Sequence, residues 1–397
     1  MNISVLPGIA RGVVDVPASK SVAHRLLLGA ALARGESVIH HVPDGADVRA
    51  TLSCLTALGI VWTREGDMVT VLGGNPRYVA PLPCGESGST LRFFLPAVLV
   101  LGKTARLEAA PALMRRPMDV FEDICRERGM LFRADAHGYT VRGLLKSGVY
   151  ELPGNVSSQF ITGLLFALPR LDGDSTIRLT TDMESRPYID MTLDVLARFG
   201  VAAQWGSRRE IAVPGGQPFS PVTQTVEGDF SSAAPLLALN ALGGDVTVRG
   251  LPAHTRQGDA ICEKHILSIA EERPVIDLSD CPDLGPVLMA LAALKHGAVF
   301  TGTRRLRLKE SDRVEAMRAE LEKMGCILTA EPDRVTVPEC ELHAPARPLS
   351  SHNDHRIAMA CALLLSATGG VLEGAEAVNK SYPVFFDTLA RLGITIS

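Results

Sequence analysis

The stretch SKSVAHRLLLGAALARGESVIHH, residues 19–41, decides the fold because its pattern recurs along the chain. A polar cap precedes a helix made almost wholly of Ala, Leu and other apolar residues, and a Gly break and a short strand follow. The further copies are SGSTLRFFLPAVLVLGKTARLEA from Ser87, SSQFITGLLFALPRLDGDSTIRL from Ser157, DFSSAAPLLALNALGGDVTVRGL from Asp229, DLGPVLMALAALKHGAVFTGT from Asp283 and DHRIAMACALLLSATGGVLEG from Asp354. Successive copies start 68, 70, 72, 54 and 71 residues apart, so internal repetition organises the chain.

These helices are apolar on all sides, which predicts that they are buried rather than surface elements. Amphipathic segments lie between them at residues 118–129, 188–200, 312–325 and 384–393, and each ends in a Gly as a helix C-cap would. Six units of strand, helix and strand predict an α/β protein. A chain of 397 residues is too long for one ordinary core, so we expect two domains of three units each. The period is long for a solenoid, the other arrangement that repeats suggest.

The composition is that of a soluble globular protein, with 46% hydrophobic, 21% charged and 5% aromatic residues. A formal net charge of −4 gives no global basic field, so wrapping a nucleic acid is not the expected role. Arginine supplies 32 of the 40 basic residues. That excess either reflects an arginine-rich genome or serves to bind carboxylates and phosphates, which the guanidinium group fits well.

Eight cysteines are scattered without a CxxC pair, which predicts reduced thiols in a cytoplasmic protein rather than disulfides or a zinc site. No apolar run reaches the roughly 18 to 20 residues that a membrane span needs. The stretch RLLLGAALA at residues 25–33 imitates a signal peptide but follows strand-like sequence, and we interpret it as a buried helix.

The caps of the buried helices carry the chemical signal, since helix N-termini present free N–H groups and a positive dipole end to anions. Any one cap can simply close its own helix. Lys20 and Arg25, however, stand one turn apart on an otherwise apolar helix, which favours an anion site over a solvated face. GESGSTLRF, residues 85–93, is a Gly/Ser-rich loop that matches none of the patterns GxxxxGK[ST], GxGxxG and GxSxG, so nucleotide hydrolysis and serine-esterase chemistry lose support.

Three further motifs combine charges at expected helix starts. MRRP, residues 114–117, ends a strand-like stretch and opens a helix, and its two arginines are either a surface pair or anion ligands. LRLKESDR, residues 306–313, offers ordinary ion pairs or a Glu held beside Lys and Arg for proton transfer. In SHNDHRIAM, residues 351–359, His352 and His355 lack a third metal ligand, so His355 and Arg356 suit an anion clamp better.

Taken together, these pieces resemble the 5-enolpyruvylshikimate-3-phosphate synthase family of enolpyruvyl transferases. The matching stretches occur in the family's order over nearly the whole chain, and they are PASKS (17–21), SGSTLR (87–92), MRRP (114–117), SSQF (157–160), SRPYID (185–190), EGD (227–229), PD (282–283), LKESDR (308–313), NDHR (353–356) and Lys380. Each motif is modest alone, but ten in register are specific.

The resemblance implies two similar domains of three βαβαββ-type repeats each, an inside-out α/β barrel with the active site in the interdomain cleft. It implies a discontinuous domain of residues 1–18 and 226–397 and an inserted domain of residues 19–225. The implied reaction transfers the enolpyruvyl group of phosphoenolpyruvate to the 5-hydroxyl of shikimate 3-phosphate, in the shikimate pathway to aromatic amino acids. It needs neither a metal nor an organic cofactor. We expect a cytoplasmic monomer with no nucleic-acid or membrane partner.

The resemblance also assigns residues. Contacts to shikimate 3-phosphate fall on Lys20, Ser21, Arg25, Ser157, Ser158, Gln159, Ser185, Tyr188 and Asp283. Contacts to phosphoenolpyruvate fall on Lys20, Gly88, Arg116, Gln159, Arg313, His355, Arg356 and Lys380. The implied catalytic residues are Asp283, the base for the 5-hydroxyl proton, Glu310, the acid that protonates the methylene carbon, Lys20 and Lys380.

Three positions depart from the family pattern. Glu86 and Ser87 stand where many relatives have Asn and Ala, and Arg305 stands where some have Asn near the 5-hydroxyl. These departures bear on herbicide sensitivity and on fine substrate geometry rather than on the reaction class.

Three alternatives remain. A UDP-N-acetylglucosamine enolpyruvyl transferase shares the architecture, but it carries an Asn after the N-terminal lysine and a loop with a Cys or Asp acid, whereas Ser21 follows Lys20 here. An RNA-end-processing or phosphate-binding protein predicts a basic surface, which the net charge does not favour. A relative that only binds anions would not need Asp283 and Glu310.

Overall fold

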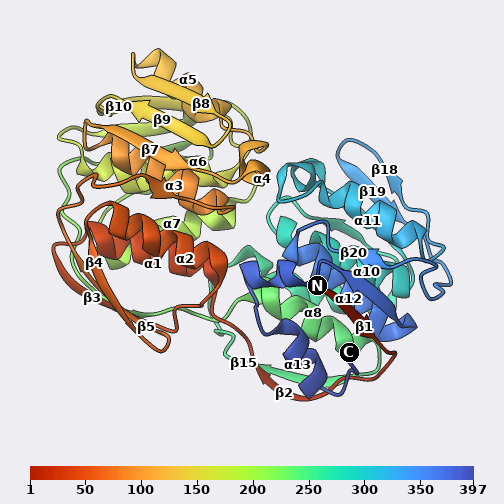
Figure 1. Cartoon of the computed structure of the whole chain (residues 1–397). Helices are drawn as coiled ribbons and strands as arrows, with labels where there is room; N and C mark the ends of the chain where they lie inside the picture. The colour runs from red at the N-terminus through yellow and green to blue at the C-terminus, as the bar shows by residue number, and fades with distance from the viewer. The chain divides into compact units, whose positions relative to one another are not determined.

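The computed structural model describes residues 1–397, which form two compact units. The inserted unit comprises Ala18–Glu227, and the discontinuous unit comprises Met1–Pro17 and Gly228–Ser397 (Figure 1). The junctions lie within two residues of the boundaries expected from the sequence.

The inserted unit alternates helices and strands along its whole length. Its helices are α1 (Lys20–Leu32), α2 (Ala46–Ala57), α3 (Gly88–Leu99), α4 (Pro111–Met114), α5 (Asp119–Glu127), α6 (Ser158–Ala167), the 3-10 helix η1 (Leu168–Arg170) and α7 (Arg186–Arg198). Its strands are β3 (Gly35–His40), β4 (Val61–Glu65), β5 (Met68–Gly73), β6 (Leu82–Pro83), β7 (Thr104–Glu108), β8 (Leu131–Asp135), β9 (Gly138–Arg142), β10 (Gly148–Leu152), β11 (Ser175–Leu179), β12 (Gln204–Ser207), β13 (Glu210–Val213) and β14 (Thr223–Thr225).

Three four-stranded sheets of the inserted unit share one topology. Their orders are β14-β3-β5-β4, β6-β7-β9-β8 and β10-β11-β13-β12, and in each the first pair is parallel and the other pairs are antiparallel. The strand β14, with which the chain leaves the unit, supplies the first strand of the first sheet. The chain therefore closes this unit by returning to the repeat with which it began.

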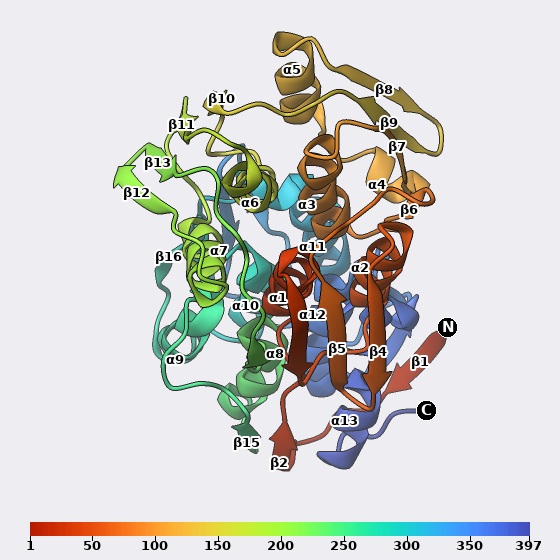
Figure 2. The same ribbon diagram turned by 90° about the vertical axis from the view of Figure 1, so that its left-hand side faces the viewer.

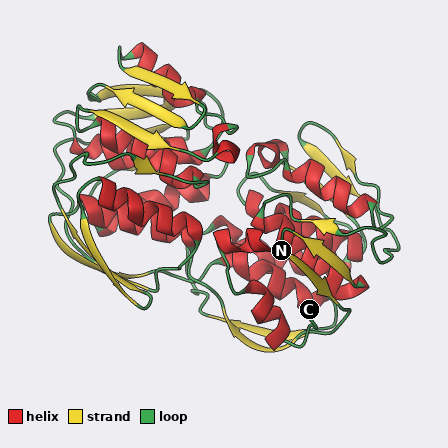
Figure 3. Cartoon of the chain, in the orientation of Figure 1, coloured by secondary structure: helices red, strands yellow, loops and turns green.

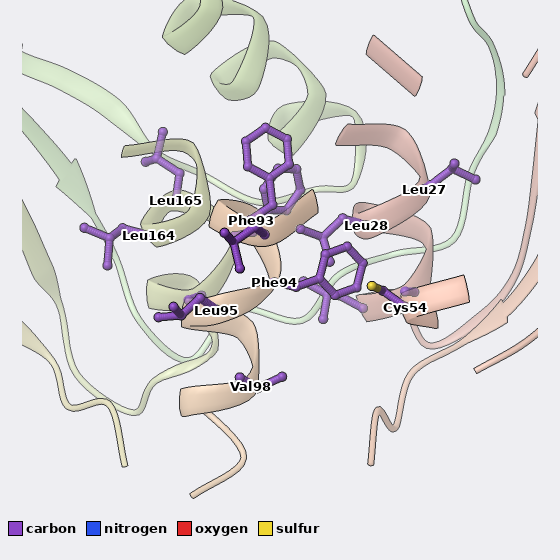
Figure 4. Packing of buried hydrophobic residues seen from close by; sticks show 14 of the residues in the cluster. Leu27, Leu28, Cys54, Phe93, Phe94, Leu95, Val98, Leu164 and Leu165 are labelled. Atoms are coloured by element: carbon purple, nitrogen blue, oxygen red, sulfur yellow. The ribbon is translucent and has the colours of Figure 1, made fainter. Parts of the chain in front are cut away.

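The first helix of each repeat, α1, α3 or α6, is buried, as its all-apolar sequence predicts. Figure 2 shows α3 and α6 side by side, and Gly163 permits this approach, because a Cβ there would lie 2.2 Å from the Arg92 carbonyl oxygen. Phe93, Phe94 and Leu95 of α3 pack with Leu27 and Leu28 of α1 in one core (Figure 4). The strands flank these helices (Figure 3).

The discontinuous unit has the same kinds of element. Its helices are α8 (Phe230–Ala241), η2 (Gly258–Ile261), α9 (Cys262–Glu271), η3 (Pro282–Leu284), α10 (Gly285–Leu294), η4 (Arg304–Leu308), α11 (Arg313–Glu322), α12 (His355–Thr368), η5 (Ala375–Lys380) and α13 (Phe385–Arg391). Its strands are β1 (Asn2–Val5), β2 (Arg11–Asp15), β15 (Asp245–Arg249), β16 (Val275–Asp277), β17 (Ala298–Thr301), β18 (Thr329–Ala330), β19 (Arg334–Val337), β20 (Leu349–Ser350) and β21 (Gly370–Glu373).

The three sheets of this unit differ from one another. The sheet β16-β17-β19-β18 repeats the order seen in the inserted unit. In β1-β21-β20 the N-terminal strand takes the third place, and Val5 bridges Ile396, so the two chain ends meet (Figure 1). The third sheet has only the parallel strands β2 and β15, because the chain enters β16 directly after α9.

The repeat that starts at Asp229 therefore lacks the two hairpin strands that follow the second helix in the preceding repeats. This corrects the expectation of three βαβαββ-type repeats in each domain, and it explains the short spacing of 54 residues. The side chain of Asn240 occupies the edge that the hairpin would cover, since it accepts a hydrogen bond from the Val246 N–H (2.7 Å) and donates one to the Val246 carbonyl (2.9 Å).

The predicted amphipathic helices form as α5, α7, α11 and α13, and each is followed by a glycine with a left-handed backbone, Gly129, Gly200, Gly325 or Gly393. The prediction for MRRP was wrong in one respect, because the short helix α4, rather than a strand, precedes Arg115 and Arg116.

The stretch 25–33, which imitates a signal peptide, lies in buried α1 as predicted, apart from its last residue. Nowhere does the structure contain a helix of the length and hydropathy required to cross a membrane.

Candidate active site

Predicted residues of the inserted unit sit at the N-termini of its buried helices. Lys20 is the first residue of α1, and its Nζ atom lies 3.0 Å from Oδ2 of Asp47, near the start of α2. The carbonyl of Ser21 accepts a hydrogen bond of 2.7 Å from the Arg25 guanidinium. The first two turns of α1 thus hold two cations, Lys20 and Arg25, and Lys20 forms an ion pair with Asp47.

Arg25 is 3% exposed and joins α1 to α7. Its Nε donates to Thr192 Oγ1 (2.8 Å) and its NH2 donates to the Tyr188 carbonyl (3.0 Å). Burial lowers the pKa of Arg25 to about 10, so the side chain stays charged at neutral pH. The same contacts bring Tyr188, and Ser185 at the left-handed N-cap of α7 (φ 57°), to this end of α1.

The loop before α3 brings Gly88 against Arg116. The Ser87 side chain caps α3 by accepting from the Thr90 N–H (3.2 Å). A Cβ on Gly88 would lie 2.7 Å from Arg116 NH1, so the guanidinium lies directly over the glycine. The absence of a side chain at position 88 therefore makes room for the arginine.

The N-terminus of α6 is tied to α3 through Gln159. Its Oε1 accepts from Arg92 NH1 (2.6 Å) and its Nε2 donates to Ser89 Oγ (3.0 Å). Ser157 caps α6 by accepting from the Gln159 N–H (3.3 Å), and buried Ser158 is the first residue of the helix. The structure thus links α3 to α6, and α1 to α7, at the ends where the predicted residues lie.

In the discontinuous unit, Arg313 at the start of α11 is the centre of a buried charge cluster. The guanidinium is 1% exposed and lies 2.8 Å from Asp283 Oδ1, 2.9 Å from Glu310 Oε2 and 2.8 Å from Asp354 Oδ2. Lys309 adds a second contact of 3.0 Å to Asp283 Oδ1. Both predicted proton-transfer residues therefore share one arginine.

The N-terminus of α12 adds the remaining predicted cations. Arg356 NH2 lies 3.8 Å from Asp229 Oδ2 and 3.8 Å from Asp283 Oδ2, while its buried Nε and NH1 have no hydrogen-bond partner. His355 is buried with Nδ1 3.7 Å from Asp354 Oδ1. Lys380 donates to the Asn353 carbonyl (2.5 Å), which places its ammonium at the same turn. Donors of Arg356 are thus left for an anion.

Opposing effects set the charges of this cluster. Burial by itself would raise the pKa of Asp283, but Lys309, Arg313 and Arg356 together lower it well below its usual range. Burial would lower the pKa of Arg313, yet Asp354, Asp283 and Glu310 raise it well above its usual range. Burial lowers the pKa of Lys309, against the attraction of Asp283, and nearby Arg313 and Arg305 lower it further. Asp283 and Arg313 are therefore both charged, and each stabilises the charge of the other.

Sequence reasoning did not assign four residues that the structure places in these networks, and they are Asp47, Arg92, Lys309 and Asp354. Asp354 and Lys309 stand inside the motifs NDHR and LKESDR, so their position next to assigned residues was a signal for them. Arg92 is the last residue of the motif SGSTLR. Asp47 had no local signal, because its contact to Lys20 depends on how α1 packs against α2.

The two histidines considered as a metal pair have separate contacts. His352 Nε2 lies 2.6 Å from Glu320 Oε1, whereas His355 lies against Asp354. The structure holds no group of three or more His, Cys, Asp or Glu side chains placed to hold a metal ion.

The chain matches a family model described as EPSP synthase (3-phosphoshikimate 1-carboxyvinyltransferase) over residues 7–389. A protein of that enzyme name from Clostridium kluyveri is 40% identical over 98% of this chain and 97% of its own length. One from Clostridium acetobutylicum is 35% identical over 98% of this chain and 97% of its own.

Solved structures share the fold. EPSP synthase from Acinetobacter baumannii superposes with a TM-score of 0.80 at 24% identity, covering 100% of this chain and 99% of that chain. The enolpyruvyl transferase NikO from Streptomyces tendae superposes with a TM-score of 0.75 at 17% identity, covering 100% and 98%. The predicted α/β fold is therefore confirmed, and it is that of the enolpyruvyl transferases. Within this class, the chain belongs to the EPSP synthase (3-phosphoshikimate 1-carboxyvinyltransferase) family.

Proposed function

We propose that the chain transfers the enolpyruvyl group of phosphoenolpyruvate to the 5-hydroxyl of shikimate 3-phosphate and releases phosphate, a step of the shikimate pathway. Membership of the EPSP synthase family over residues 7–389 is the observation that carries this conclusion. Support also comes from the two polar networks, one in the inserted and one in the discontinuous unit, which contain residues that we assign to the reaction.

The two substrates bring phosphate and carboxylate groups, whose mutual repulsion must be offset by cations and helix N-termini. We assign shikimate 3-phosphate to Lys20, Ser21, Arg25, Ser157, Ser158, Gln159, Ser185, Tyr188 and Asp283. We assign phosphoenolpyruvate to Lys20, Gly88, Arg116, Gln159, Arg313, His355, Arg356 and Lys380. Support comes from the unpartnered donors of Arg356 and from the placement of Arg116 over Gly88.

The proposed chemistry begins with addition. The 5-hydroxyl oxygen attacks C2 of phosphoenolpyruvate, Asp283 takes the hydroxyl proton, and Glu310 delivers a proton to C3, which becomes a methyl group. The product of this step is a tetrahedral ketal. The bond from C2 to the phosphate oxygen then breaks, phosphate leaves with the bonding electrons, and a methyl proton passes to the carboxylate of Glu310, which restores the double bond. Lys20 and Lys380 supply positive charge near the phosphate as it departs.

A base needs a pKa near the working pH, yet three cations hold the pKa of Asp283 low. Two of these cations, Arg313 and Arg356, are also the proposed ligands of phosphoenolpyruvate. When they bind the substrate's carboxylate and phosphate, they contribute less to Asp283, and the pKa of Asp283 rises. Binding of one substrate thus prepares the base for the hydroxyl of the other.

Phosphate release tests the proposal. The purified protein should release phosphate only when phosphoenolpyruvate and shikimate 3-phosphate are both present. Turnover with UDP-N-acetylglucosamine in place of shikimate 3-phosphate, or no turnover with either acceptor, would contradict it. The monomeric state, the cytoplasmic location and the lack of a nucleic-acid partner stay predictions from the sequence.

A further inference from the structure

His352 and Asn353 adopt an unusual backbone immediately before α12. Both have positive φ angles, 49° and 54°, which lie in the left-handed region that residues other than glycine seldom occupy. Such a conformation persists only when surrounding contacts hold it. The two residues directly precede Asp354, the N-cap of α12, and the helix then begins with His355 and Arg356.

A buried carboxylate holds this turn. Glu320 is 1% exposed, and its Oε1 atom lies 2.6 Å from Nε2 of His352. Its Oε2 atom accepts from the Ser350 N–H (2.8 Å) and from Lys323 Nζ (2.7 Å). Burial would raise the pKa of Glu320, but His352, Lys323 and the Ser350 N–H lower it below its usual range. The carboxylate is therefore ionised and fully engaged by the segment before α12 and by its own helix.

Helix α11 contacts the segment before α12 through two side chains. Arg313 at its start donates to Asp354 (Nε to Oδ2, 2.8 Å), and Glu320 follows seven residues later. Seven residues are about two turns, so both side chains leave the same face of the helix. Asp354 in turn accepts from the Arg356 N–H (2.9 Å), while the Asn353 carbonyl accepts from Lys380. The turn that Glu320 holds therefore includes the groups that contact Arg356 and Lys380 and fix their positions.

We propose that Glu320 is a positioning residue for phosphoenolpyruvate, which acts through His352 by holding the left-handed turn before α12. It touches no reacting atom. Its effect reaches the substrate through Arg356 and Lys380, so it concerns phosphoenolpyruvate and not shikimate 3-phosphate. The inference rests on the proposed function, which assigns Arg356 and Lys380 to phosphoenolpyruvate.

Two variants test whether the contact between Glu320 and His352 positions the ligands of phosphoenolpyruvate. Each keeps either the shape of the side chain or its tolerance of the left-handed backbone. Glu320→Gln keeps the shape of the side chain and removes its charge. His352→Asn keeps a residue that tolerates the left-handed region but is too short to reach Glu320. Each variant should raise KM for phosphoenolpyruvate about tenfold, as loss of a charged hydrogen bond would, with KM for shikimate 3-phosphate within about twofold of the unsubstituted value. Glu322→Gln, at an exposed position on the same helix, is the matched control and should change neither KM.

A double variant separates positioning from general damage. If Glu320 acts through His352, the two substitutions together should raise KM for phosphoenolpyruvate no more than the stronger single one does. Additive effects, equal rises in both KM values, or no rise in either single variant would overturn the inference. Should Glu320→Gln fail to fold, His352→Asn decides, since its side chain is one-third exposed. No turnover by the unsubstituted protein would instead overturn the proposed function, and the inference with it.

Discussion

The Arg313 guanidinium lies 2.8 Å from Oδ1 of Asp283, and a second oxygen of the same carboxylate lies 3.8 Å from Arg356. The proposed base is therefore held by the two arginines that are proposed to bind the other substrate. Removing one member of a buried charge cluster leaves its partners uncompensated. A change at Asp283 should accordingly affect both the chemistry and the stability of the discontinuous unit.

Asp283→Asn should lower kcat by about 10²- to 10⁴-fold, the contribution typical of general acid–base catalysis. Phosphoenolpyruvate binding should be weakened far less, because Arg313 and Arg356 remain. Phosphate release and equilibrium binding of phosphoenolpyruvate measure the two effects. Asp123→Asn, which breaks an exposed ion pair on α5, is the control and should leave both unchanged. If Asp283→Asn retained more than about a tenth of the rate, Asp283 would not be the base.

Glu310→Gln removes the proposed proton donor while keeping a side chain of the same size beside Arg313. We expect a fall in kcat of about 10²- to 10⁴-fold with the folded state preserved. A single-turnover experiment, with substrate exchange at C3 followed in deuterated water, measures protonation directly. Unchanged incorporation of deuterium at C3 would assign the acid to another residue.

Gly88→Ala tests the approach of Arg116. The added Cβ would lie 2.7 Å from Arg116 NH1, so the guanidinium must move away. Because the obstructing group is the end of a flexible side chain, we expect normal folding, a raised KM for phosphoenolpyruvate and a smaller change for shikimate 3-phosphate. Steady-state kinetics with each substrate varied in turn measure this. Gly206→Ala, where a Cβ would meet only the Glu210 carbonyl oxygen at 4.0 Å, should behave as the unsubstituted protein does.

Buried His24 predicts a pH dependence of stability. Burial lowers its pKa to about 3, and its Nδ1 lies 2.7 Å from Thr51 Oγ1. The folded state keeps the ring neutral, whereas the unfolded state takes up a proton near pH 6.5. The unfolded chain therefore binds more protons below that pH, and His24 costs up to about 1.4 kcal/mol of stability for each pH unit lost between pH 6.5 and 3.

Urea unfolding of the unsubstituted protein and of His24→Gln at pH 7.5, 6.0 and 5.0 isolates this contribution. The difference in unfolding free energy between the two proteins should shift in favour of the variant as the pH falls. A difference that stayed constant with pH would mean that His24 takes up its proton over the same pH range in the folded and unfolded states.

Much of the fold could be predicted from the repeats, because burial of an all-apolar helix is a local consequence of its composition. The pairing of strands at the sheet edges could not be predicted. The strands β1 and β14 join sheets whose other strands lie far away in the sequence, and nothing local in Asn2–Val5 or Thr223–Thr225 specifies that partner. The missing hairpin had a signal, the short spacing after Asp229, which the expectation of equal repeats concealed.

The helix caps pointed to the candidate anion-binding residues. A helix N-terminus with a cation beside it favours an anion as its ligand over water. The carboxylates were harder to assign. Asp354 caps α12 and also binds Arg313, and the second role requires α11 to lie beside it. Glu320 stands in an ordinary amphipathic pattern, so its contact with His352 has no trace in the sequence.

Asn240 hydrogen-bonds the backbone of β15 in the shortened repeat, and this contact supports a final prediction. Its amide satisfies both backbone groups of Val246 at an edge that the missing hairpin leaves without a strand. Asn240→Ala should lower the unfolding free energy by about 1 kcal/mol, with turnover unchanged, and should speed hydrogen exchange at the Val246 amide. Asn240→Asp keeps the acceptor for the Val246 N–H but loses the donor to its carbonyl, so its exchange rate should fall between the two. Equal exchange at Val246 in all three proteins would mean that the edge is protected by other contacts, since a strand edge closed by one side chain must open when that side chain is removed.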